Sequence, residues 1–258
     1  MAIFRYSMMV LIALLAAACL TPATALAEAK KSFEYGDITL DRTSKGGTTM
    51  PVIFRHWVHR AKHSCRLCHV DLEFAMHAGQ TGITEDDNKA GRYCGTCHNG
   101  KEAFAVDQCS RCHPKDAQSA DEMNLAAKKQ FFAFAKNLPK SLYGNKINWN
   151  QAEDEGLLKT KDFIEGVSFP DKSPITNSRE EARKSTAEGL PGIIFSHPKH
   201  ATWTGCGMCH PEPFALEIGA TKMTMKEITN GQYCGMCHGK VAFPLYNCAE
   251  CHSKPVQQ

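Results

Sequence analysis

Hydrophobic residues are spread unevenly along the chain. One unbroken apolar run covers residues 8–20, which is shorter than the roughly 20 residues that a membrane-spanning helix needs. A second pattern has apolar residues at helical spacing, and it consists of Met123, Ala126, Ala127, Phe131 and Phe134. Because the capping box Ser119-x-x-Glu122 precedes this pattern and Leu138-Pro139 follows it, a helix is predicted over about 120–136.

The remainder of the chain lacks long periodic segments. Residues 143–189 contain several Gly together with Pro170 and Pro174, and they are predicted to form an irregular linker. Residues 30–50 are polar and contain Gly, which is typical of an arm lying against a neighbouring unit. The pattern therefore predicts a mainly α and irregular fold of short helices and loops.

The N-terminal apolar run has the features of a secretory signal peptide. Arg5 precedes it, and small residues follow it up to Ala25-Leu26-Ala27, after which cleavage is expected. Residues 1–27 are therefore predicted to direct export. An uncleaved anchor and a lipid-bearing Cys19 are the alternatives.

Cysteine is the residue type that most restricts the possible functions of the chain. The chain has 258 residues and 13 cysteines, and twelve of them fall in six copies of the pattern Cys-x-x-Cys-His. Hydrophobic residues at 43% and charged residues at 22% form an ordinary globular balance, which excludes a disordered or collagen-like chain. The cysteine pairs are Cys65 and Cys68, Cys94 and Cys97, Cys109 and Cys112, Cys206 and Cys209, Cys234 and Cys237, and Cys248 and Cys251. The histidines that end the six copies are His69, His98, His113, His210, His238 and His252.

The six motifs form two clusters of three that repeat one another. The pattern Phe54-x-His56-x-x-His59 precedes the first cluster and recurs before the second as Phe195-x-His197-x-x-His200. A duplicated module is therefore predicted. Its expected parts are a signal peptide at 1–27, an arm at 28–50, a first module at 51–118, a linker at 119–190 and a second module at 191–258.

The repeated motif is the attachment signature of c-type haem. Its two thiols are spaced to reach the two vinyl groups of one porphyrin, and the adjacent histidine can bind the iron from the same side. Zinc and disulfide chemistry also use paired cysteines, but zinc would need further partners and a disulfide pair needs no following histidine. Six copies therefore favour six covalently bound haem groups.

The histidines outside the motifs provide a second indication. They are His56, His59, His63, His77, His197 and His200, and all precede or lie within the two clusters. Two histidines at positions i and i+3 lie on one side of a helical turn. One turn can therefore ligate two different irons and hold two haems close together.

With these motifs, residues 51–115 and 191–255 resemble the triheme cytochromes c of the cytochrome c7 type, the smaller relatives of tetraheme cytochrome c3. The resemblance implies two triheme modules, six haem c groups and electron transfer. It also implies distal ligands, with the first histidine of each Phe-x-His-x-x-His pattern binding the first haem and the second binding the second haem. The implied pairs are His56 with His69, His59 with His98, His197 with His210, and His200 with His238. With so few residues per haem, the haems are expected to take the place of a large hydrophobic core.

The third haem of each module departs from the family pattern, because neither module has a histidine just ahead of its second motif. In the first module His77 is the favoured distal ligand and His63 the alternative. In the second module Met225 or Met223 is the candidate, with core packing as the alternative role. If no side chain binds, that iron keeps an open position.

The resemblance favours an electron carrier, not an enzyme. Its expected place is a bacterial respiratory chain, in the periplasm or at the outer surface of a Gram-negative cell. Expected partners are other redox proteins, such as cytochromes or a membrane quinol-oxidising complex. A multihaem reductase with one open haem, and a subunit of a larger cytochrome wire or membrane redox complex, are the alternatives.

The net charge of +3 does not indicate nucleic-acid binding, because twelve haem propionates would reverse its sign. The mature chain is also not expected to span a membrane. Lysines near the motifs are candidates to pair with propionates or to steer a redox partner, with simple solvation as the alternative. They are Lys62, Lys101, Lys199 and Lys240.

Overall fold

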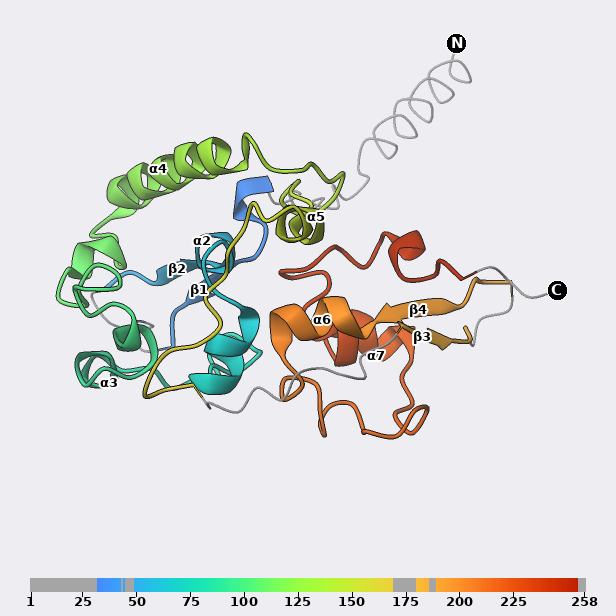
Figure 1. The fold of residues 1–258 in the computed structure, drawn as a ribbon. Helices are drawn as coiled ribbons and strands as arrows, with labels where there is room; N and C mark the ends of the chain where they lie inside the picture. The colour runs from blue at the N-terminus through green and yellow to red at the C-terminus, as the bar shows by residue number, and fades with distance from the viewer. Residues whose placement is uncertain (1–31, 43, 45–48, 169–179, 186–188, 255–258) are drawn as a thin grey trace, which may run out of the picture. The chain divides into compact units, whose positions relative to one another are not determined.

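The computed structural model describes residues 32–42, 44, 49–168, 180–185 and 189–254 (Figure 1). The predicted signal peptide and Cys19 lie outside these residues. The helices are α2 (His56–Arg60), α3 (Glu85–Lys89), α4 (Ala117–Ala135), α5 (Trp149–Asp154), α6 (His197–Thr204) and α7 (Met225–Thr229). The strands are β1 (Asp37–Leu40), β2 (Val52–Arg55), β3 (Glu180–Arg183) and β4 (Ile193–Ser196). Single helical turns are η1 (Ser32–Glu34), η2 (Leu67–Asp71), η3 (Tyr93–Thr96), η4 (Cys109–Arg111), η5 (Tyr233–Met236) and η6 (Cys248–Glu250).

The same order of elements occurs twice. In the first half, β1 pairs antiparallel with β2, and β2 runs straight into α2. In the second half, β3 pairs antiparallel with β4, and β4 runs straight into α6. Phe54 lies opposite Ile38 in one ladder and Phe195 opposite Glu181 in the other. Two repeats of short helices and loops with little sheet confirm the predicted fold class.

The short helices α3 and α7 depend on their caps. Five residues are too few for a helix to be stable alone. Each of the two begins with a complete capping box, in which Thr84 pairs with Asp87 and Thr224 with Glu227. The same device in both repeats fixes the loop between the first and second motifs.

Helix α4 begins earlier than predicted. Its N-cap is Asp116, whose carboxylate accepts from the Ser119 amide at 2.7 Å, while the Ser119 hydroxyl accepts from the Asp116 amide at 3.0 Å. The predicted box between Ser119 and Glu122 is therefore wrong. Asp116 supplies an equally good cap three residues upstream, so Ser119 becomes the third helical residue.

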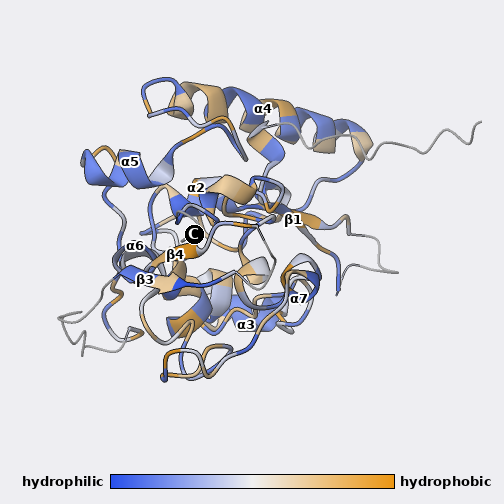
Figure 2. Ribbon diagram, turned by 90° about the vertical axis from the view of Figure 1, so that its right-hand side faces the viewer, coloured by the Kyte–Doolittle hydropathy of each residue, from blue (hydrophilic) through white to orange (hydrophobic). Residues whose placement is uncertain are grey.

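A hydrophobic cluster joins the linker to both modules, which corrects the expectation that haems alone form the core. Trp57 packs against Phe131 of α4 with ring centres 5.3 Å apart, and Figure 2 shows polar and apolar stretches alternating along that helix. The segment 143–189 is also less irregular than predicted, because it contains α5 and β3. The buried cluster consists of Phe33, Trp57, Phe131, Ala135, Leu138, Ile147, Trp149, Ala152, Leu158 and Trp203.

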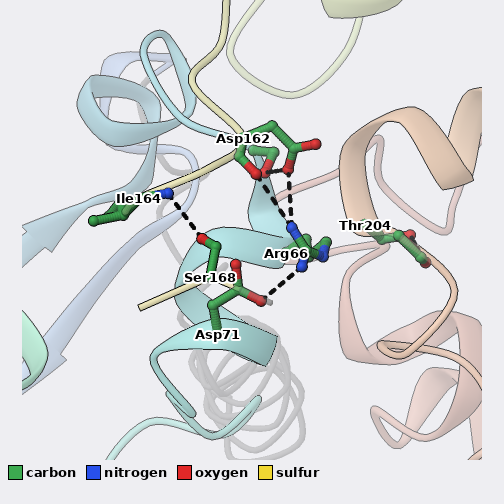
Figure 3. A network of polar contacts seen from close by, with 8 residues as sticks. Arg66, Asp71, Asp162, Ile164, Ser168 and Thr204 are labelled. Atoms are coloured by element: carbon green, nitrogen blue, oxygen red, sulfur yellow. Dashed lines mark hydrogen bonds and ion pairs between the residues drawn. The ribbon is translucent and has the colours of Figure 1, made fainter. Parts of the chain in front are cut away.

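Polar contacts tie the linker to the first motif (Figure 3). Arg66, inside that motif, forms an ion pair with Asp71 at 3.0 Å and donates to the Asp162 carbonyl at 3.2 Å. Asp162 also accepts from the Ser64 hydroxyl at 2.5 Å. Because Asp71 is fully buried, its charge depends on Arg66 for compensation. Among the residues described, no helix is long and apolar enough to span a membrane.

Candidate haem-binding sites

Five of the six haem motifs are bent into the same tight turn. The histidine amide donates to the carbonyl of the first cysteine, as in the bond of 2.9 Å from His98 to Cys94 and the bond of 2.8 Å from His252 to Cys248. The same bond recurs at His113, His210 and His238. Such a turn gathers two thiols and an imidazole from five consecutive residues. The fold therefore presents the donor set that one haem c requires.

Within the described residues, the motif cysteines form neither disulfides nor a zinc site. All twelve motif cysteines are free thiols in the described chain. Within the same residues, no three His, Cys, Asp or Glu side chains are arranged to hold a metal ion. The tetrahedral set that zinc needs is therefore not formed by these side chains.

Three histidine pairs have the spacing expected across an iron. The ring centres are 6.5 Å apart in the pair His56 and His69, 6.3 Å in His59 and His98, and 6.2 Å in His200 and His238. A metal–imidazole bond is about 2.0 Å, and the ring centre lies about 1 Å beyond the nitrogen, so two rings on one metal have centres about 6 Å apart. Each pair joins a motif histidine to one on α2 or α6.

In the fourth predicted pair, His197 and His210 are each oriented by a contact of their own. Phe195 meets the His197 ring edge-on at 4.7 Å and 88°, and Phe54 meets His56 at 4.9 Å and 87°. His197 is thus oriented like its repeat equivalent. His210 is held through its Nδ1 by the Phe214 carbonyl at 2.7 Å.

Backbone carbonyls hold the imidazoles in one tautomer. A carbonyl can only accept, so each Nδ1 that contacts one carries the hydrogen and Nε2 keeps a free lone pair. The distances run from 2.6 Å at His56 to 3.3 Å at His238. The nine histidines held in this way are His56, His59, His69, His98, His113, His200, His210, His238 and His252.

Burial keeps five of the six paired rings neutral. It lowers the pKa of His56, His59 and His238 to about 4, and it also lowers the pKa of His69 and His200. A neutral imidazole binds a metal without first losing a proton. These rings are therefore ready ligands at neutral pH.

Phenylalanines orient the ligand rings, a role the sequence did not reveal. Phe54 stacks on His59 with ring centres 4.3 Å apart, and the ring centres of Phe195 and His200 are 4.2 Å apart. Phe104 and Phe243 lie 4.3 Å and 4.1 Å from the motif histidines His98 and His238. These phenylalanines occupy identical positions in the two repeats, and that repetition was the sequence feature that could have indicated their role.

Glycine is required inside the second motif of each module. A Cβ on Gly95 would lie 1.8 Å from the Asn88 carbonyl oxygen, and one on Gly235 would lie 1.8 Å from the Ile228 carbonyl oxygen. Such distances are far inside van der Waals contact. Each motif turn therefore packs directly onto the end of α3 or α7.

At the third haem site of each module, the described residues define the position of the motif histidine alone. His113 is held by the Met50 carbonyl and His252 by the Pro191 carbonyl, both at 2.8 Å. In the described chain no imidazole faces either ring across the iron spacing found above. His77 lies in an exposed loop, and Met225 is the first residue of α7 and 49% exposed.

The alternative ligand His63 lies elsewhere. Its backbone bridges to Lys161 of the linker. Burial first, then Lys161 and Lys62, lower the pKa of His63, which the nearby Glu102 carboxylate opposes. The distal ligands of the two third sites therefore remain predictions.

Comparison with known proteins identifies the family. The sequence profile described as "Cytochrome c7 and related cytochrome c" matches residues 52–114 and 193–253, one match over each cluster of motifs. The chain belongs to the cytochrome c7 family. This family binds haem c covalently, and the Cys and His donors described above fit that group. Among curated proteins, none matches the sequence.

Solved structures of multihaem cytochromes match the chain as well. A c7-type three-heme cytochrome domain is 36% identical and covers 31% of this chain and 93% of its own, with a TM-score of 0.27. The C-terminal hexaheme fragment of GSU1996 is 24% identical and covers 84% of this chain and 96% of its own, with a TM-score of 0.27. The N-terminal hexaheme fragment of GSU1996 is 25% identical and covers 84% of this chain and 98% of its own, again with a TM-score of 0.27. That score is too low for the structural likeness to carry weight.

Proposed function

We propose that this c7-type cytochrome is an exported hexahaem protein that transfers electrons between redox partners. The observation that carries the proposal is the set of three imidazole pairs with ring centres 6.2–6.5 Å apart. Each imidazole pair would hold one iron, and an iron held in this way would have no position left for a substrate. Bound haem supplies one-electron redox chemistry, and the protein supplies its ligands and its surroundings.

The proposed ligands follow the repeat. Covalent attachment uses the twelve motif cysteines, and the six motif histidines are the proximal ligands. The proposed distal ligands are His56, His59, His197 and His200, with His77 and Met225 at the third sites. A bacterial respiratory chain in the periplasm or at the cell surface is the proposed setting, with other redox proteins as partners.

A reductase is the second candidate, because the described part of the chain pairs no second imidazole with His113 or His252. An iron that keeps an open position can bind a small molecule. His113 and His252 mark the two places where this would occur.

Electron paramagnetic resonance of the oxidised protein, with haem counted on the same sample, tests the proposal. Six covalent haems per chain, all low-spin, are the expected result, since every iron would then have two protein ligands. A high-spin signal from one or two haems would favour the reductase. Fewer than six haems in fully loaded protein would contradict the proposed ligand set.

The variant His200→Met tests the pairing directly. It should raise the reduction potential of the haem attached at Cys234 and Cys237 by on the order of 100 mV, because axial ligands set the potential over a range of roughly 0.8 V. The measurement is a redox titration resolved by haem. His59→Met is the matched control and should move the haem at Cys94 and Cys97 instead. Equal shifts in both modules would contradict the pairing.

A further inference from the structure

Arg60, the last residue of α2, connects the two modules. Its guanidinium lies 4.4 Å from the ring centre of Trp149 in the linker and 4.9 Å from that of Trp203 in the second module. It also donates to the Val241 carbonyl of the second module at 3.2 Å. A planar guanidinium between two indoles is a favourable cation–π arrangement. One side chain of the first module thus contacts both the linker and the second module.

The charge on Arg60 has no carboxylate beside it. Within the described residues it forms no ion pair, and its buried Nε has no hydrogen-bond partner. Burial lowers the pKa of Arg60, but a guanidinium stays protonated in a protein. A buried cation without a counter-ion is unfavourable for folding. Stability alone is therefore a poor explanation for an arginine at this position.

Comparison of the two repeats shows that haem binding does not require an arginine at the position of Arg60. Its repeat equivalent is Ala201, and the equivalent of Trp203 is Lys62. Both modules nevertheless carry the complete set of motif cysteines and histidines. Arg60 and Trp203 are thus specific to the junction between the modules.

Two haem-attachment sites meet at this junction. The guanidinium of Arg60 lies close to the Cys65 thiol of the first module and to the Cys237 thiol of the second. Burial and then Cys65 raise the pKa of Cys237 to about 12, so these two thiols also lie near each other.

The arm of the first module reaches the same place. Tyr35 donates its hydroxyl to the Ala242 carbonyl at 2.5 Å. A Cβ on the next residue, Gly36, would lie 3.5 Å from the His56 side chain and 3.6 Å from that of Val241. The distal ligand of the first haem site is therefore in close proximity to the segment that follows His238.

We propose that Arg60 is the positioning residue of the junction: it holds the first haem site of module one beside the second haem site of module two, and its buried charge raises the reduction potential at these two sites. The inference rests on the proposed function. A fixed positive charge in a medium of low dielectric constant favours the reduced form, which carries one positive charge less. In haem c the propionates are on the porphyrin edge opposite the thioether bonds, so those of these two haems would not neutralise a charge beside the cysteines.

A haem-resolved redox titration of the full-length, haem-loaded chain tests this, with proton NMR following each haem. In Arg60→Met, two haems should show a ratio of reduced to oxidised form at least tenfold lower at the wild-type midpoint, or about 59 mV for one electron. They should be those attached at Cys65 and Cys68 and at Cys234 and Cys237. The other four should change less than threefold.

Two further variants separate charge from packing. Arg60→Lys keeps the charge and loses the flat stacking group, so it should retain most of the potential at both sites. Lys129→Met removes a cation that is exposed on α4 and lies outside every motif, and it should leave all six potentials nearly unchanged because water screens that charge. Shifts spread over all haems, or none in Arg60→Met, would overturn the proposal.

The unmodified protein provides an independent test. Nuclear Overhauser contacts in the reduced state should connect substituents of the haem at Cys65 with those of the haem at Cys237. Their absence would overturn the junction even if Arg60→Met did not assemble. Failure of the proposed function would look different, since the wild-type chain would then lack six haems or the paired ligation.

Discussion

A chain whose first module has all six motif cysteines replaced by alanine is expected to carry three covalent haems and to lose the folded structure of that module. The helices described in the first module are five residues or shorter, and such helices do not hold together without tertiary packing. Four of them, α2, η2, η3 and η4, carry cysteines or histidines that would surround porphyrin. The replaced residues are Cys65, Cys68, Cys94, Cys97, Cys109 and Cys112.

Intact mass and a thermal melt followed by circular dichroism measure this effect. The wild type should melt cooperatively with six haems, and the variant should lose about half of the transition. The double variant Cys65→Ala with Cys68→Ala is the graded control, and it should carry five haems and retain a weakened transition. A native-like melt of the six-fold variant would show that the polypeptide does not need haem to fold.

The sequence was most informative where chemistry dictates spacing. Two thiols and an imidazole must lie within five residues to attach one haem, so the motif can be recognised without a fold. The i and i+3 spacing of His56 and His59 places both on one side of a turn, and the structure pairs them with His69 and His98. Local geometry alone sets these features.

The core could not be predicted because it is assembled from distant single residues. Trp57, Trp149 and Trp203 come from α2, α5 and α6, and each stands alone in its local pattern. Among the described helices, only α4 carries a periodic apolar face, so it was the part of the cluster that the sequence could predict. The positions of α3 and α7 were likewise set by capping boxes that no apolar pattern accompanies.

The third distal ligands depend on where a loop runs. His77 and Met225 lie in or beside the loop between the first and second motifs, and both side chains are exposed there. Spacing to a cysteine does not determine which side chain turns inward there. His59 and His200 are more tightly constrained, because each lies on a helix that directly follows a strand.

Phe131→Ala is expected to lower the free energy of unfolding by about 3–5 kcal/mol, because it removes a phenyl ring from a packed site and leaves a cavity. Phe131 is 1% exposed and packs edge-on against Trp57. The cluster around it joins the linker to both modules, so the loss should also loosen the junction at Arg60. Chemical denaturation of the haem-loaded chain, followed by tryptophan fluorescence, measures the change.

Phe132→Ala is the matched control, since the neighbouring residue has the same side chain on the same helix but is 51% exposed. Its free energy of unfolding should stay within about 0.5 kcal/mol of the wild type. Haem content should be six in both variants, because neither side chain contacts a motif histidine. If the two substitutions weakened the protein equally, the cluster on α4 would not be the core of the folded chain, and stability would have to come from the haem sites themselves.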